Sequence, residues 1–208
     1  MNSYTKAKKL LQTFADSFNE FRRIYGAGHN STIGLIAHLW LSIDPRNVVQ
    51  DDAPDMTIEG TRRRPDLLLG ESFSSNKDKY VGVVEVENEP EKKWHDLERK
   101  ICWSLKGGGP NISSWYNEVE WFLLCLDPRS LPDNWQNRLL NILNGSSSYC
   151  KNHAQGKIFV ILVYFVPGKS GTENRRVGIE LYEIDAHSIS PISPKVSPQP
   201  HIGKIRQG

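Results

Sequence analysis

Cysteine is scarce in this chain of 208 residues, long apolar runs are missing, and the excess of basic over acidic residues is small. The three cysteines (Cys102, Cys125 and Cys150) are an odd set without metal-like spacing, so a reducing cytoplasm is the default location. No apolar run approaches the ~18 residues of a membrane span, and the N-terminus lacks the apolar stretch of a secretory signal. We therefore expect a cytoplasmic protein without membrane contact. The net charge of +2 neither requires nor excludes a nucleic-acid partner.

Apolar residues make up 38% of the chain, which is enough to bury the core of one ordinary domain. Their helical spacing predicts helices over about residues 11–25, 31–41, 91–106 and 132–144, with Ser31 capping the second. Short apolar segments predict strands at 48–49, 56–58, 65–69, 80–86, 119–126, 157–166 and 177–184. The fifth of these is an almost continuous apolar run, as in a strand buried on both faces. This order favours a single α/β domain over residues 1–186, with a mixed central sheet flanked by helices. Residues 187–208 are rich in serine, proline and basic residues, which predicts a weakly ordered tail.

The most informative feature is a pair of glutamates. Glu85 lies in the predicted strand 80–86, and Glu87 follows that strand directly. Side chains alternate along a strand, so Glu85 and Glu87 point together to one face, away from the neighbouring valines. Such paired carboxylates are costly unless positive charge lies against them. If this strand forms a hairpin with strand 65–69, then Asp66 lies beside Glu85. Three carboxylates on one sheet face would offer the oxygen-rich site that Mg²⁺ prefers.

With these residues, the sequence resembles the PD-(D/E)XK nuclease superfamily, which has the restriction-endonuclease-like fold. Pro65-Asp66 stands for the PD motif and Glu85-Val86-Glu87 for the (D/E)XK motif, and the element order over residues 48–126 is similar. The resemblance implies that Asp66 and Glu85 bind a divalent metal, Mg²⁺ or Mn²⁺, and that the third motif position helps to activate water. This chain has Glu87 there instead of lysine. An acidic residue at that position acts as a metal ligand or base in some restriction enzymes.

The same motif letters occur elsewhere in the chain. Pro-Asp is repeated at 54–55 and 132–133, and Glu-x-Lys occurs at 91–93 and 98–100. Both Glu-x-Lys copies fall on a predicted helix, where positions two apart subtend about 200° and cannot serve one metal. Asp133 starts a predicted helix and is better explained as a cap, so Asp55 is the main rival of Asp66. A simpler alternative also stays open, in which Glu85 and Glu87 line a solvated sheet face.

Three arginines immediately precede the proposed motif, and arginine suits phosphate oxygens. Alternation along an extended segment puts Arg62 and Arg64 on the side of Asp66, whereas Arg63 points the other way and packs or pairs elsewhere. The competing interpretation is that these arginines pair with acidic residues nearby in sequence.

Lys93 and Lys100 lie one heptad apart on one face of the predicted helix that follows the motif. Either lysine could supply the positive charge that position 87 lacks, by stabilising the scissile phosphate. The competing interpretation of each is an ordinary solvated lysine. Four of the six histidines form no pair with metal-like spacing and receive no role: His29, His38, His95 and His153.

The hypothesis from sequence is a Mg²⁺- or Mn²⁺-dependent nuclease that hydrolyses DNA phosphodiester bonds, as in restriction, repair or defence. The expected catalytic and metal-binding residues are Asp66, Glu85 and Glu87, and the expected nucleic-acid contacts are Arg62, Arg64, Lys93 and Lys100. The alternative is a nuclease-fold protein that no longer cuts and serves as a binding or scaffold module. The missing lysine and the near-neutral charge favour that alternative. A homodimer is left open.

Overall fold

The computed structural model describes residues 1–25, 28–51, 56–58, 61–73, 77–106, 116–150, 152–166 and 176–192. Its helices are α1 (Ser3–Tyr25), α2 (His29–Ile43), α3 (Pro90–Ser104) and α4 (Trp135–Leu143), with a 3₁₀ turn η2 at Pro128–Ser130. Its strands are β1 (Asn47–Gln50), β2 (Met56–Ile58), β3 (Thr61–Arg63), β4 (Leu67–Phe73), β5 (Lys77–Glu87), β6 (Trp121–Leu126), β7 (Lys157–Val166), β8 (Arg176–Ile184) and β9 (Ile189–Pro191).

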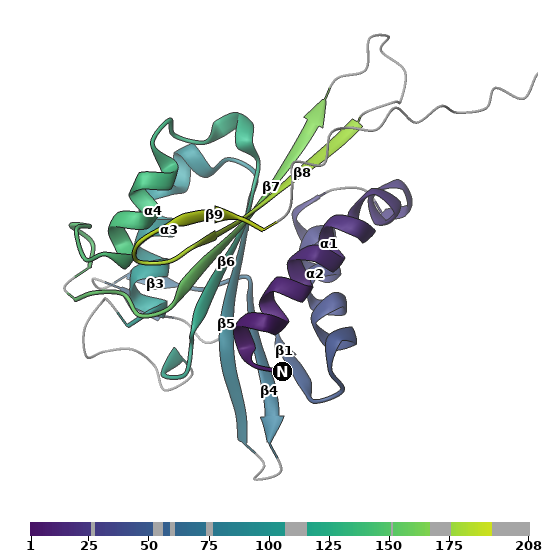
Figure 1. Ribbon diagram of the computed structural model, residues 1–208, viewed down its shortest axis with the longest axis horizontal. Helices are drawn as coiled ribbons and strands as arrows, with labels where there is room; N and C mark the ends of the chain where they lie inside the picture. The colour runs from purple at the N-terminus through teal and green to yellow at the C-terminus, as the bar shows by residue number, and fades with distance from the viewer. Residues whose placement is uncertain are drawn as a thin grey trace, which may run out of the picture.

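Seven strands form one mixed sheet in the order β1-β4-β5-β6-β7-β8-β9, and β2 pairs with β3 in a separate hairpin. Strands β1, β4 and β5 are antiparallel, β5 to β7 run parallel, and β7 to β9 are antiparallel again. A parallel pair needs a crossover, which α3 provides between β5 and β6. Helices α1 and α2 cover one face of the sheet and α3 and α4 the other (Figure 1). The predicted α/β class, with a mixed sheet flanked by helices, is therefore confirmed.

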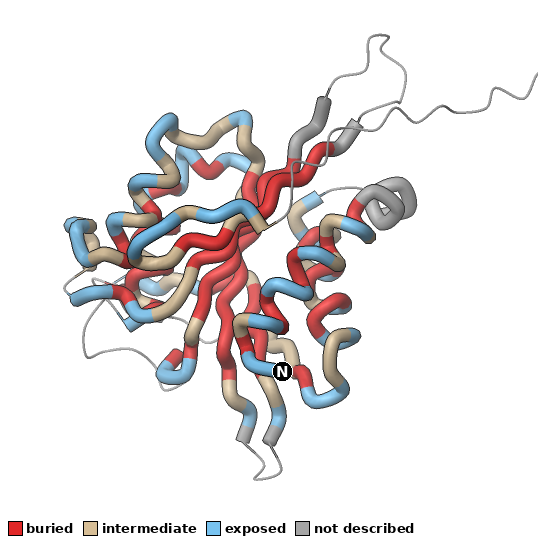
Figure 2. The backbone as a smooth tube through the Cα atoms, viewed as in Figure 1, coloured by how far each residue is buried: buried red, intermediate tan, exposed pale blue. Residues whose placement is uncertain are grey.

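The buried strands in the middle of the sheet separate two apolar cores (Figure 2). Leu68 and Val83 belong to the core under α3 and α4, whereas Leu67 and Val84 belong to the core under α1 and α2. Every residue of β6 is buried, as the sequence predicted. Because Val83 faces α3, the alternation of β5 also directs Glu85 and Glu87 to the α3 side.

Helix α2 begins earlier than predicted. The predicted cap at Ser31 is wrong, because Gly28 is the N-cap in an extended conformation and Ser31 lies in the first turn. The carbonyl of Gly28 accepts hydrogen bonds from the backbone N–H and the hydroxyl of Thr32, which fixes the start of the helix there. Within the described ranges, no helix is long and apolar enough to cross a membrane.

The described chain continues past the predicted domain end at residue 186. Strand β9 pairs with β8, so residues 189–191 belong to the sheet. Residues 193–208, most of the predicted tail, lie outside the described residues.

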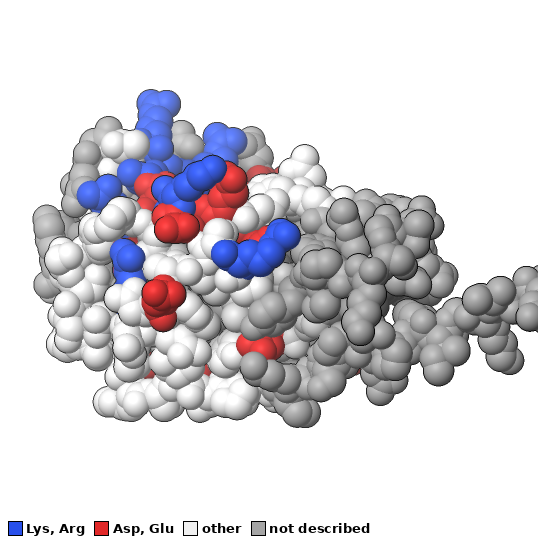
Figure 3. All heavy atoms as spheres, turned by 90° about the horizontal axis from the view of Figure 1, so that it is seen from above, with Lys and Arg blue, Asp and Glu red and all other residues white. Residues whose placement is uncertain are grey.

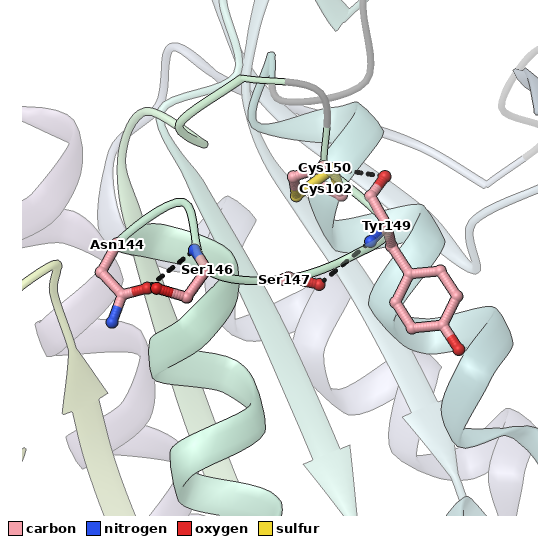
Figure 4. Close-up of a disulfide and its surroundings, with 6 residues drawn as sticks. All are labelled: Cys102, Asn144, Ser146, Ser147, Tyr149 and Cys150. Atoms are coloured by element: carbon pink, nitrogen blue, oxygen red, sulfur yellow. Dashed lines mark hydrogen bonds between the residues drawn. A yellow bond between two sulfur atoms is a disulfide. The ribbon is translucent and has the colours of Figure 1, made fainter.

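A disulfide joins Cys102 of α3 to Cys150, which follows α4, across a sequence separation of 48 (Figure 4). The spacing of the cysteines had not indicated this pairing. Beside it, the Tyr149 hydroxyl contacts the Nδ1 atom of His95, and the guanidinium of Arg99 lies 5.3 Å from the centre of the Tyr149 ring. The loop after α4 is therefore fastened to α3, the helix whose lysines border the site described next.

Candidate active site

The sequence-predicted acids line one pocket of about 210 Å³ at the end of the sheet where β5 finishes and β4 begins. Figure 3 views the molecule from above this end, where acidic and basic side chains lie next to one another. Three layers contribute to the lining, namely the start of α2, the β4–β5 pair and α3. The lining residues are His29, Asp66, Glu85, Val86, Glu87, Lys93, Asp96, Leu97 and Lys100.

Pairing of β4 with β5 brings Asp66 to the glutamates. The register matches Leu67 with Val84, so that Asp66, one residue earlier, lies beside Glu85. One carboxylate oxygen of Asp66, Oδ2, accepts the backbone N–H of Val86 at 2.7 Å. The hairpin predicted from sequence is confirmed, and Asp66 is held against the strand that carries both glutamates.

Glu85 is the most deeply buried acid of the pocket, with 5% of the residue exposed. Its Oε1 lies 2.7 Å from the Nζ of Lys100, whose side chain is also largely buried. Burial raises the pKa of Glu85 to about 7; Lys100 opposes that rise, and the negative charge of Asp66 adds to it. The ammonium of Lys100 therefore does not offset the effects of burial and of Asp66 on the pKa of Glu85, which lies near neutral pH.

Glu87 lies two residues further along β5, nearer the solvent. Its Oε2 contacts the Nζ of Lys93 at 2.8 Å, and its Oε1 accepts the backbone N–H of Glu89 at 3.0 Å. Partial burial acts to raise the pKa of Glu87, but the bonds from Lys93 and the Glu89 N–H outweigh it and lower that pKa. The two glutamates of the motif therefore differ, because Glu87 is held ionised and Glu85 is not.

The two lysines predicted to flank the motif both reach it. Lys93 and Lys100 are two turns apart on α3, and each ammonium group contacts one glutamate. Lys100 also donates to the backbone carbonyl of Arg64 at 2.9 Å, which ties α3 to the segment before Asp66. In this arrangement the lysines contact carboxylates, whereas the sequence hypothesis placed them on nucleic acid.

The three arginines diverge. Arg63 forms an ion pair with Asp96 of α3, while Arg62 and Arg64 are exposed. Arg63 was predicted to pair away from Asp66, but its partner Asp96 belongs to the lining of the same pocket as Asp66. The competing interpretation paired these arginines with Asp51, Asp52 and Glu59. Asp51 is exposed in the structure, whereas Asp52 and Glu59 lie outside the described residues, as does the rival Asp55.

Two lining residues were missed by sequence reasoning. His29, at the start of α2, has its Nε2 3.4 Å from Asp66 Oδ2, although 37 residues separate them in the chain. Asp96 adds a fourth carboxylate from α3. Nothing in the local sequence marks either residue, because the first depends on how α2 docks and the second resembles any polar position of an amphipathic helix.

The donor chemistry of the pocket suits a divalent cation. Carboxylate oxygens of Asp66, Glu85 and Glu87 line one cavity. Burial is the main cause of the raised pKa of Glu85, and repulsion from the other two carboxylates adds to it. In the described ranges, with the lysines on the glutamates, no three His, Cys, Asp or Glu side chains are grouped closely enough to hold a metal ion. Binding of an ion there would therefore require these side chains to rearrange.

Comparisons of the chain with protein-family models, with curated proteins and with solved structures found no match.

Proposed function

We propose that the protein is a metal-dependent nuclease that hydrolyses DNA phosphodiester bonds, with a restriction-endonuclease-like fold. The observation that carries the proposal is the meeting of Asp66, Glu85 and Glu87 in one pocket beside two lysines. The order β1, β4, β5, α3, β6, with a crossover helix after the acidic strand, supports the fold assignment. A pocket of about 210 Å³ is large enough for hydrated ions and a phosphate group.

In this proposal the three acids have different roles. Asp66 and Glu85 hold a divalent ion, Mg²⁺ or Mn²⁺, and Glu87 either adds a ligand or accepts a proton from the attacking water. The bond from the Val86 N–H to Asp66 orients that carboxylate, so that little reorganisation is needed there. When bound, the ion lowers the pKa of water and stabilises negative charge on the phosphate.

Lys100 and Lys93 take the role of the missing motif lysine. Each already lies within hydrogen-bonding distance of a motif glutamate, at 2.7 and 2.8 Å. If an ion takes over the neutralisation of the acids, these ammonium groups become available for the oxygens of the scissile phosphate. Arg62 and Arg64, exposed before Asp66, then contact the phosphates that lead into the pocket.

Cleavage of plasmid and single-stranded DNA, with Mg²⁺ or Mn²⁺ and with EDTA, tests the proposal. We expect metal-dependent cleavage, and Asp66→Asn should abolish it while leaving the protein folded. Asp133→Asn is the matched control, because Asp133 stands in another Pro-Asp pair but is exposed. The predicted cap at Asp133 is wrong, since α4 begins at Trp135 and its N-cap is Asn134. Asp55→Asn tests the rival position. Full activity of Asp66→Asn, with loss in Asp55→Asn, would refute the proposed site.

A second candidate is a nuclease-fold module that binds nucleic acid without cutting. The ion pairs of Glu85 with Lys100 and of Glu87 with Lys93 favour it, because they neutralise the motif acids without a metal. Such a module would bind DNA equally well with EDTA and with Mg²⁺, and would cleave none of it.

For the location we keep the cytoplasm as a proposal, based on the sparse cysteines. The Cys102–Cys150 disulfide argues in the other direction, since structural disulfides are typical of oxidising compartments. Thiol titration of the denatured protein tests this point. A single reactive thiol, from Cys125, indicates the disulfide, and three thiols in freshly isolated protein support the cytoplasm.

A further inference from the structure

His29 is a lining residue to which the proposed mechanism gives no role. It lies at the start of α2, on the other side of the sheet from α3, and its ring reaches the pocket edge. Its Nε2 is 3.4 Å from Oδ2 of Asp66, the same oxygen that accepts the Val86 N–H. This nitrogen therefore faces the carboxylate that the proposed function assigns to the metal.

The partner of the other ring nitrogen, Nδ1, determines which tautomer His29 adopts. Nδ1 lies 3.2 Å from the side-chain oxygen of Asn30, which can only accept a hydrogen bond, so Nδ1 carries the hydrogen. In the neutral ring, the lone pair then remains on Nε2 and points toward Asp66. Metal-binding histidines use this arrangement, in which a neighbouring acceptor holds one nitrogen and leaves the other for the ion.

A lone pair and a carboxylate oxygen repel each other at this separation unless positive charge lies between them. A proton on Nε2 is one such charge, and a metal ion bound by both atoms is the other. Two ligand atoms at right angles on one ion, each ~2.1 Å away, lie about 3 Å apart. The observed 3.4 Å needs only a small adjustment to reach that value.

We infer that His29 is a nitrogen ligand of the ion held by Asp66, so that the site binds a first-row transition ion such as Mn²⁺ in preference to Mg²⁺. The inference rests on the proposed metal-dependent function. Its physical basis is that Mg²⁺ takes oxygen ligands almost exclusively, whereas transition ions gain affinity from imidazole. A mixed set of one nitrogen and several carboxylate oxygens therefore selects against Mg²⁺.

Electron paramagnetic resonance of Mn²⁺ bound to the full chain tests this directly. We expect spin-echo spectra of the wild type to show coupling to a nitrogen nucleus, and His29→Gln to lose it. The matched control is His187→Gln, because His187 is exposed in the turn between β8 and β9, at the other end of the strands. Calorimetry should show Mn²⁺ affinity falling by about tenfold or more in His29→Gln, and Mg²⁺ affinity changing by less than about twofold.

The outcomes separate this inference from the proposed function. If Mn²⁺ binds, requires Asp66 and shows no nitrogen coupling in the wild type, then His29 is no ligand and the carboxylate site stands. If Mn²⁺ binding does not depend on Asp66, both the His29 inference and the proposed function are wrong. The wild-type spectrum tests the nitrogen ligand even if His29→Gln does not fold, and Mn²⁺ binding by Asp66→Asn tests the carboxylate site.

Discussion

Strand β4 has an acidic residue near each end, and the buried residue beside these two acids differs in charge. Near its C-terminal end, Glu71 joins Asp44 around Lys6, whose side chain is completely buried and lies 3.0 Å from both carboxylates. Just before its N-terminal end, Asp66 joins a group in which the buried residue is itself an acid, Glu85.

The charges of the Lys6 cluster are satisfied within the cluster, whereas the acids of the pocket are suited to bind a cation. At Lys6, the buried ammonium has acceptors on several sides, including the side-chain oxygen of Asn47 at 3.0 Å. Hydrogen bonds from Arg46, and then from Lys6, hold the pKa of Asp44 well below its ordinary value. In the pocket, by contrast, burial raises the pKa of Glu85 to about 7 despite its contact with Lys100, and open volume adjoins the acids. A buried carboxyl with a strongly raised pKa next to a cavity is typical of a functional site.

The largest expected effect comes from breaking the Lys6 cluster. Lys6→Met leaves two partly buried carboxylates without their shared cation, which should lower the free energy of unfolding by about 3–5 kcal/mol. Lys8→Met on the same helix is the control, because Lys8 is half exposed in its pair with Glu183 and should cost less than about 1 kcal/mol. Urea denaturation measures both. Equal losses would show that the Lys6 cluster is not the buried structural element described here.

A smaller effect is expected at Glu85, and it depends on pH. Its folded-state pKa of about 7 lies above the ordinary value of 4.5, so the folded protein binds this proton more tightly than the unfolded chain does. The corresponding stability is complete below pH 4.5 and is lost as the pH rises through 7. For the metal-free protein, this loss amounts to about 3 kcal/mol between pH 4.5 and pH 8.5.

Glu85→Gln cannot ionise and should escape that loss. Compared with the wild type in the absence of metal, the variant should therefore gain stability steadily as the pH rises from 5 to 8.5. Denaturation of both proteins across this range measures the difference. A difference that is independent of pH would mean that Glu85 titrates at its ordinary value.

The smallest effects are expected at the exposed arginines, which affect binding and not folding. Arg62→Ala and Arg64→Ala should each lower the salt dependence of DNA binding by about one unit of slope. Arg63→Ala should change that slope much less, because Arg63 pairs with Asp96. Titration of binding against salt compares the three variants. Equal slopes for all three would indicate a diffuse basic patch.

Strand parity and hairpin pairing could be predicted from the sequence because they follow from local alternation. The valines of β5 fix which way Glu85 and Glu87 point, and pairing with the apolar run of β4 brings Asp66 beside them. The helical heptad spacing similarly put Lys93 and Lys100 on one face.

What the sequence could not give depends on how separate layers dock. His29 reaches Asp66 only because α2 packs with its N-terminus at this end of the sheet. The pairing of Cys102 with Cys150 needs α3 and the loop after α4 to lie side by side. The start of α2 was misplaced because Ser31 is a common N-cap residue, while Gly28 has no side chain to signal one.

One assay compares the two ends of β4 most directly, namely metal-dependent DNA cleavage by Glu85→Gln and Glu71→Gln side by side. Both changes remove one negative charge from a partly or fully buried cluster at nearly constant volume. Our account predicts that Glu85→Gln loses about a thousandfold in rate, as expected when several kcal/mol of transition-state stabilisation are removed. Glu71→Gln should keep cleavage close to the wild-type rate. Wild-type cleavage by Glu85→Gln, or equal losses in both variants, would contradict the assignment of the active site.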